Sequence, residues 1–260
     1  MIPGIILQLL LEISIVIVIA LFLTYAGFII IRKKFSHEFL SEYHTVASYM
    51  FNSISITYGV LLAFVVYLNW FNYEKSEQNI ENETAYLSNF YRDTRTLPDS
   101  IRNAITNKLI NYTKSVIDDE WITMSKGKTS PHTEAALDSL WKSFTSIPAN
   151  SITNIYFYQF AIERLNFISQ CRRQRILDME QTTPAVIWTV LIICGSISVG
   201  YTYFFSTKKR RAHLSLIATI IIVNVLIFYL IYVLDHPFEG YTGISQEPFK
   251  LVLDKFYNLK

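Results

Sequence analysis

Cysteine is scarce in this sequence. Its 260 residues include only Cys171 and Cys194. The first lies near a predicted helix end and the second inside an apolar run, so no disulfide is expected between them. Neither cysteine has the spacing of a zinc site. His37 and His44 lie seven residues apart, which is too far for two ligands on adjacent helical turns. We therefore predict no metal site and no cofactor.

Charge is also sparse, and it is unevenly placed. Charged residues make up 17% of the chain, with a formal net charge of +2. They gather in the middle of the sequence and in short clusters beside apolar runs. No basic tract is interleaved with aromatic residues, the pattern that indicates nucleic-acid binding. No nucleophile–base pair or phosphate-binding loop is visible either, so an enzyme is the least favoured class.

Long apolar runs dominate what remains. Hydrophobic residues make up 51% of the chain and aromatic residues 15%, which is high for a soluble protein. Four runs are long enough, at about 1.5 Å per helical residue, to cross the roughly 30 Å hydrocarbon layer of a bilayer. The sequence therefore predicts an all-α membrane protein with four transmembrane helices. The predicted spans are residues 13–31, 47–72, 184–205 and 214–234.

The stretch between the second and third spans has a different character. It is charged, it has helical periodicity, and it has no alternating strand pattern. We predict four helices. The first continues from the membrane to Pro98, the second is capped by Asp99 or Ser100, and the third begins at Pro131. The fourth is expected to turn its inner face along Ile155, Tyr158, Ile162, Leu165 and Ile176.

These features predict four parts of the chain. Two pairs of membrane helices flank a helical extramembrane domain, and an amphipathic tail follows. The tail is expected to lie either on the membrane or on the domain. The predicted boundaries are 1–72 for the first helix pair, 73–183 for the domain, 184–236 for the second pair and 237–260 for the tail.

The second span has no charged residue, but small and polar residues recur along it at steps of three and four. Such spacing places them on one helix face. Polar side chains inside a membrane face a partner helix or water. Two interpretations stay open, namely helix packing through small residues and a pore lined by dipoles with an apolar constriction. The residues of this stripe are Ser48, Asn52, Ser55, Gly59, Ala63, Val66 and Asn69.

Charged residues suggest a second group of candidates. Glu77, Glu81 and Glu83 follow the second span, while Arg172 and Arg175 precede the third. We predict that they form an ion network, which either holds the domain together or sets the charge of a vestibule.

Other carboxylates have simpler interpretations. Glu12, near the first span, is either an interfacial carboxylate or a pore-mouth residue. Asp118, Asp119 and Glu120 are interpreted as a solvated helix end or cap. Asp235, beside His236, is expected to cap a helix or to pair with an arginine.

Two short basic clusters set the expected topology. Residues 32–34 and 208–211 are both runs of lysine and arginine beside apolar spans. The positive-inside rule places both loops in the cytoplasm. The helical domain and both termini are then expected in the periplasm or on the outer face of the cell.

Several short motifs along nearly the whole chain resemble the bestrophin-like family of bacterial and plant membrane proteins. The most specific string runs from Leu234 to Gly240. The other matching residues are Glu83, Thr84, Ala85, Leu87, Tyr91, Arg92, Leu97, Pro98, Tyr112, Asp119, Glu120, Trp121, Arg172, Arg173, Gln174, Arg175, Pro184, Trp188, Ile244, Ser245, Glu247, Pro248 and Phe249.

This resemblance implies an architecture related to bestrophins, which are pentameric ion channels with a pore lined by the second membrane helix. Bestrophins keep their soluble domain in the cytosol, whereas the charge rule here predicts the opposite. The acidic clasp of calcium-gated members has no equivalent in this sequence. We expect a homo-oligomeric ion channel of the bacterial inner membrane, with a slight preference for cations. The alternative is a non-conducting scaffold or sensor whose helical domain binds a partner.

Overall fold

The computed structural model describes residues 2–34, 43–152, 154–205, 210–240 and 242–258, and all the structural statements below refer to these residues. The chain forms two compact units. One comprises Met1–Phe71 and Thr183–Asp235, and the other comprises Asn72–Thr182 and His236–Lys260. Helix α3 (His44–Asp93) is continuous and contributes its first part to one unit and its second part to the other.

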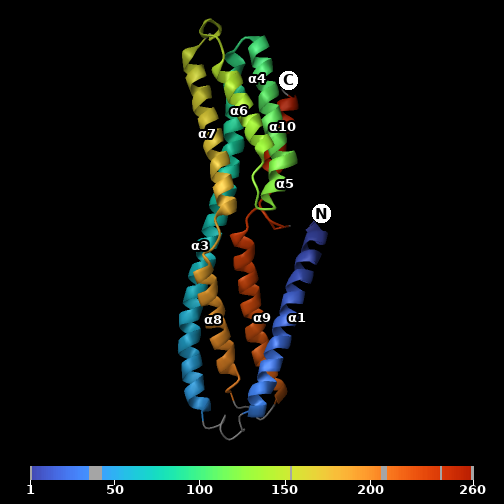
Figure 1. Cartoon of the computed structure of the whole chain (residues 1–260), viewed down its shortest axis with the longest axis vertical. Helices are drawn as coiled ribbons and strands as arrows, with labels where there is room; N and C mark the ends of the chain where they lie inside the picture. Colours follow the sequence, from blue (N-terminus) through green and yellow to red (C-terminus); the bar gives the residue numbers. More distant parts are fainter. Residues whose placement is uncertain (1, 35–42, 153, 206–209, 241, 259–260) are drawn as a thin grey trace. The chain divides into compact units, whose positions relative to one another are not determined.

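The first unit is built from long apolar helices (Figure 1). Besides the first part of α3 it contains α1 (Ile2–Lys34), α8 (Ala185–Thr202) and α9 (Arg210–Asp235). The prediction of four membrane helices is confirmed, because four segments are long and apolar enough to cross a bilayer. The apolar windows lie within the helical stretches Leu7–Lys34, Thr45–Thr96, Ile155–Thr202 and Arg211–Asp235.

Apolar side chains hold this unit together. Tyr58, Leu62 and Val65 of α3 pack against Leu191 of α8 and Ile231 of α9. Phe28 of α1 packs against α9 in a separate cluster. The helices also satisfy their backbone hydrogen bonds internally, which is the condition for crossing lipid.

The outward faces of the same helices carry large apolar side chains. On α3, Val60 is 68% exposed, Phe64 61% and Tyr67 62%. Soluble monomers rarely leave so much contiguous apolar surface in water. These faces are therefore suited to lipid or to other subunits.

The second unit is a helical domain around one core. The second part of α3 and a 3-10 turn at Thr94–Thr96 lead into the other helices. These are α4 (Asp99–Ser115), α5 (Trp121–Met124), α6 (Pro131–Thr145), α7 (Ile155–Glu180) and α10 (Glu247–Asn258). Among the residues described, no segment forms a strand.

Local caps explain where two of these helices begin. Ser130 Oγ accepts a hydrogen bond from Thr133 N at 3.0 Å, and Pro131 occupies the first turn of α6 as expected. Asn154 Oδ1 accepts from the backbone nitrogens of Tyr156 and Phe157 at the start of α7. Both helix starts are therefore set by hydrogen bonds between residues that are close in the sequence.

Three sequence-based expectations differ from the structure in this domain. Asp99 does not cap α4, because Pro98 occupies the cap position and Asp99 instead binds Arg102 at 2.8 Å. The second helix is not regular to Trp121, since a wide π-helical turn interrupts it at Val116–Glu120. Ile155, expected on the inner face of α7, is 53% exposed.

The C-terminal helix settles the alternative left open for the tail. Phe249 and Phe256 of α10 have no solvent exposure and belong to the core of the helical domain. The ring of Trp121 lies 5.8 Å from that of Phe249. Because its apolar face is covered by protein, α10 lies on the domain and not on a membrane surface.

Candidate functional site

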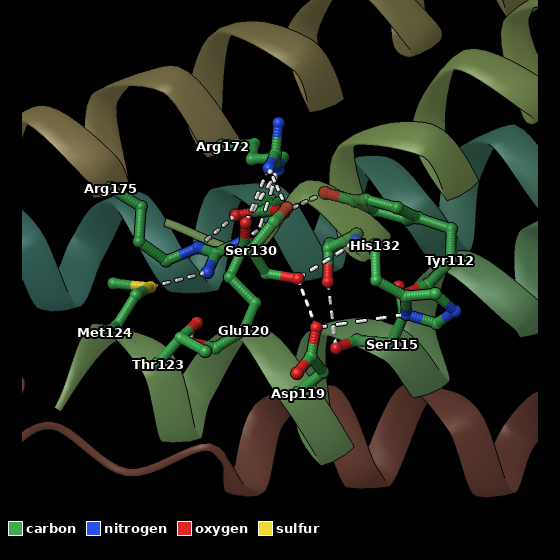
Figure 2. Close-up of polar contacts among 12 residues, drawn as sticks. Tyr112, Ser115, Asp119, Glu120, Thr123, Met124, Ser130, His132, Arg172 and Arg175 are labelled. Carbon is green, nitrogen blue, oxygen red and sulfur yellow. Dashed lines mark hydrogen bonds and ion pairs between the residues drawn. The ribbon is translucent and has the colours of Figure 1, made fainter. Parts of the chain in front are cut away.

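Four charged side chains meet inside the helical domain (Figure 2). Arg175 Nε lies 3.0 Å from Glu83 Oε2, and Arg175 Nη2 lies 2.9 Å from Glu120 Oε2. Arg172 Nη2 lies 2.6 Å from Glu120 Oε1. All four are buried, and three of them have side chains with no solvent exposure. We call these four residues the buried ion network.

Helical spacing brings the network together. Glu83 lies between Ile80 and Leu87 on the buried face of α3, while Arg172 and Arg175 continue the buried face of α7. Glu120 follows Val116 by four residues at the end of the π-helical turn. Three elements that are distant in sequence thus each contribute charge to one point in the core.

Neighbouring groups complete the network. Tyr112 Oη donates to Glu83 Oε1 at 2.7 Å, and Met124 Sδ lies 3.1 Å from Arg175 Nη1. The guanidinium of Arg175 also lies 5.7 Å from the ring of Trp121 and 5.4 Å from that of Phe249, within the range of cation–π contacts. Two carboxylates balance two guanidinium groups, so the cluster carries no net charge.

Burial and neighbouring charges shift the pKa of three groups at this site. Burial would lower the pKa of Arg175, but the carboxylates of Glu83 and Glu120 outweigh burial and raise it above its ordinary value. Burial, followed by the charge of Glu83, raises the pKa of Tyr112 well above its ordinary range. Burial also raises the pKa of the Cys171 thiol to about 11. At neutral pH the Cys171 thiol and the Tyr112 hydroxyl therefore both keep their protons.

The structure brings together only some of the charged residues proposed from the sequence. Glu83, Arg172 and Arg175 are in the network, whereas Glu77 and Glu81 are exposed on α3. Glu81 Oε2 instead accepts a hydrogen bond from Gln78.

Glu120 corrects an interpretation made from the sequence. It is not part of a solvated helix end, because it is fully buried between two arginines. The signal was present, since Glu120 is the next position on the inward stripe of Leu109, Tyr112 and Val116. Asp118 is exposed, while Asp119 is partly buried and accepts from Ser130 Oγ.

The predicted stripe on α3 divides into three classes of exposure. Asn52, Gly59 and Ala63 are exposed on the surface of the single subunit, and Ser48, Ser55 and Val66 are partly buried. Asn69 is different, because it is 6% exposed and its Nδ2 donates to Val65 O at 3.0 Å. Asn69 therefore lies inside the subunit, and its assignment to a pore surface is wrong.

Asn69 belongs to a polar junction between α3, α8 and α9. The Thr183 hydroxyl lies 3.0 Å from Asn69 Oδ1. Asp235 Oδ1 accepts from both the backbone nitrogen and the hydroxyl of Thr183, each at 2.6 Å. Asp235 thus holds the chain just before α8 but does not cap that helix, whose N-cap is Pro184. Among the described residues it forms no ion pair with an arginine.

A second polar contact lies among the membrane helices. Tyr58 Oη donates to Asn224 Oδ1 at 2.8 Å. A Cβ atom on Gly195 would stand 2.8 Å from Tyr58 Oη, so only glycine leaves room for this bond. Asn224 is the one strongly polar residue in residues 214–234. Its partner Tyr58 was not among the candidate residues on α3.

Glu12 lies near the start of α1, in a different compact unit from the buried ion network. Glu12 Oε2 accepts from Tyr229 Oη at 3.1 Å on an exposed surface of α1 and α9. Its role at a pore mouth stays a prediction. Within the described ranges, no three histidine, cysteine or acidic residues are grouped so that they could hold a metal ion.

Comparison with known proteins identifies a matching family and similar solved structures. A family model described as the Bestrophin-like domain matches residues 17–249. A solved variant of a bacterial bestrophin homologue from Klebsiella pneumoniae superposes with a TM-score of 0.73 at 12% identity, covering 95% of this chain and 97% of that chain. A crystal structure described as a membrane protein gives 0.71 at 12% identity, covering 94% and 98%. A search of curated proteins finds no match.

The buried ion network predicts unequal effects for two neighbouring arginines of α7. Arg175→Leu leaves Glu83 and Glu120 short of a buried partner, and we expect it to destabilise the protein by about 3–5 kcal/mol. Arg173→Leu removes an exposed charge and is expected to change stability by less than about 0.5 kcal/mol. Denaturant unfolding of the detergent-solubilised protein, followed by near-UV circular dichroism, measures both. Equal losses would contradict a structural role for the network.

Proposed function

The chain belongs to the Bestrophin-like family, and from this premise we propose that it is a homo-oligomeric ion channel, with no catalytic activity of its own. Ions would pass down their gradient through a pore on the symmetry axis, lined by the membrane part of α3. The bestrophin resemblance supports a ring of five subunits in the bacterial inner membrane.

One observation carries this proposal. Asn52, Gly59 and Ala63 lie exposed on one face of α3, in a segment composed of membrane-compatible residues. An amide facing hydrocarbon without a partner costs several kcal/mol, about 2–7 kcal/mol depending on the reference state. Facing a water-filled axis removes that cost for Asn52. The small side chains of Gly59 and Ala63 on the same face leave space for ions.

Charge along α3 supports a preference for cations. Trp70 and Glu77 follow Ala63 at steps of seven residues, and Glu81 follows Glu77 by four. All three therefore lie on the same face of α3 as the stripe. Both carboxylates are exposed, whereas Arg172 and Arg175 are neutralised in the buried ion network. Arg173, between them, is exposed. Rings of Glu77 and Glu81 would concentrate cations near the pore. Trp70, 55% exposed, would narrow it.

A non-conducting scaffold or sensor is the second candidate. The start of α7, in the helical domain, exposes Tyr156 at 69% and Phe160 at 49%. Aromatic residues on an extramembrane surface are typical of protein–protein contacts. This surface would bind a partner under the scaffold hypothesis, and a neighbouring subunit under the channel hypothesis.

For orientation we propose that the basic ends of α1 and α9 face the cytoplasm. Lys33, Lys34 and Arg211 are exposed there, next to apolar spans. The loops 35–42 and 206–209, which include His37 and Lys208, lie outside the described residues. The helical domain would then be periplasmic, in contrast to the cytosolic domain of bestrophins.

Cysteine accessibility tests the pore face. In a background with Cys171→Ser and Cys194→Ser, we expect a charged, membrane-impermeant thiol reagent to modify Asn52→Cys and Ala63→Cys and to alter ion flux from liposomes severalfold. The neighbouring positions Ser53→Cys and Phe64→Cys, which point to another face of α3, serve as matched controls. Equal modification of both sets, or flux that is unaffected at Asn52 and Ala63, would contradict the assignment of the pore face.

Labelling also tests the orientation. Lys128→Cys, in an exposed loop of the helical domain, is expected to react with an impermeant maleimide in intact spheroplasts, where the periplasmic face is open. Reaction only after the membrane has been permeabilised would place the domain in the cytosol.

A further inference from the structure

A groove runs along the seam between α1 and α9. It encloses about 190 Å³ and lies within the segments that are apolar enough to span a membrane. Its walls are the matching stripes of the two helices. They consist of Leu21, Thr24, Tyr25 and Phe28 from α1 and Leu214, Ile217, Ala218 and Ile221 from α9.

The interior of this groove is apolar. Its one aliphatic hydroxyl, on Thr24, already donates to Ala20 O at 2.8 Å. Ile217 and Ile221 form its buried floor, while Tyr25 at the rim is 44% exposed. The groove is therefore suited to bind a hydrocarbon chain and is not suited to bind water or a small ion.

Each wall of the groove is followed by an arginine at one end. Arg32 follows Phe28 by four residues on α1, and Arg211 precedes Leu214 by three residues on α9, so each occupies the next position on its stripe. Arg32 donates to His213 Nδ1 at 3.2 Å and its guanidinium lies 5.2 Å from the ring of Phe28. The groove therefore has one cationic end, with Lys33 exposed beside it.

These cations are not neutralised within the part of the chain that the structure describes. No ion pair joins Arg32, Lys33 or Arg211 to a carboxylate there. Arg32 Nε is buried and has no hydrogen-bond partner among those residues. A guanidinium with a donor to spare, at the level where a span ends, is suited to bind a phosphate oxygen.

We propose that this groove binds an anionic phospholipid, with its phosphate at Arg32 and Arg211 and one acyl chain against Tyr25, Phe28 and Ala218. This apolar groove ends in cations that have no carboxylate partner among the described residues, so it is complementary to an amphiphile with a negative head. Basic pockets between membrane helices bind anionic headgroups by this chemistry. Because the contacts lie on α1 and α9, the lipid would clamp these helices together, independently of whether α3 lines a pore.

The test compares two lipids that have identical acyl chains. Phosphatidylglycerol and phosphatidylcholine are titrated against the full-length protein in detergent, and bound lipid is counted by native mass spectrometry. We expect phosphatidylglycerol to be retained preferentially. In Lys33→Gln/Arg211→Gln, which leaves the Arg32–His213 contact in place, its affinity should fall about fivefold for each basic residue removed. Lys126→Gln/Lys128→Gln, which removes two exposed lysines from the helical domain, is the matched control and should bind like the wild type.

A second pair of variants tests the role of the groove. Ala218→Phe fills the groove and should weaken retention of both lipids, while Ser215→Phe on an exposed face of α9 should not. Glycerol phosphate, the headgroup without chains, should compete only weakly. Unchanged phosphatidylglycerol preference in the double glutamine variant would overturn the headgroup assignment, and tight binding of glycerol phosphate alone would overturn the role of the groove.

Discussion

The contact between Arg175 and its two carboxylates is the interaction on which the helical domain depends. Transferring a guanidinium and two carboxylates out of water costs several kcal/mol for each ion, so the cluster is tolerable only when every charge is paired. Glu83, Glu120 and Arg172 complete that pairing from α3, the π-helical turn and α7. A shift of one residue in any of these elements would leave a charge unpaired in the core. The network therefore selects one register among helices that apolar packing alone would hold less specifically.

The membrane helices are held by different contacts. Apolar packing between helices gains little over packing against lipid, so close approach and a few buried hydrogen bonds carry the specificity. Gly195 admits the bond from Tyr58 to Asn224, and Asp235 fixes the backbone of Thr183 where α8 begins. These polar groups are satisfied within one subunit. The amide of Asn52 lies on the exposed face, which is why we propose that this part of α3 faces an aqueous axis.

Much of the fold follows from the sequence because its signals are local. The four spans follow from uninterrupted apolar runs, and the start of α6 follows from Pro131. The Asn154 cap of α7 is seen only in the structure. Glu120 was missed because a carboxylate next to two others normally lies in water, and its partner Arg172 lies 52 residues later in the chain. Asn69 was assigned to the wrong face for a similar reason. Three- and four-residue steps place it beside Val66, but only the position of Thr183 reveals which way its amide turns.

Recording from a planar bilayer shows whether this chain conducts ions. Purified protein is reconstituted under a potassium chloride gradient, and the current is recorded as a function of voltage. We expect a reproducible current whose reversal potential is shifted from zero toward the equilibrium potential of potassium, because the carboxylates of Glu77 and Glu81 would attract cations to the pore entrance. Silence at verified reconstitution, across voltage, pH and calcium concentration, would contradict the channel and favour the scaffold, with the stripe on α3 serving to pack subunits together.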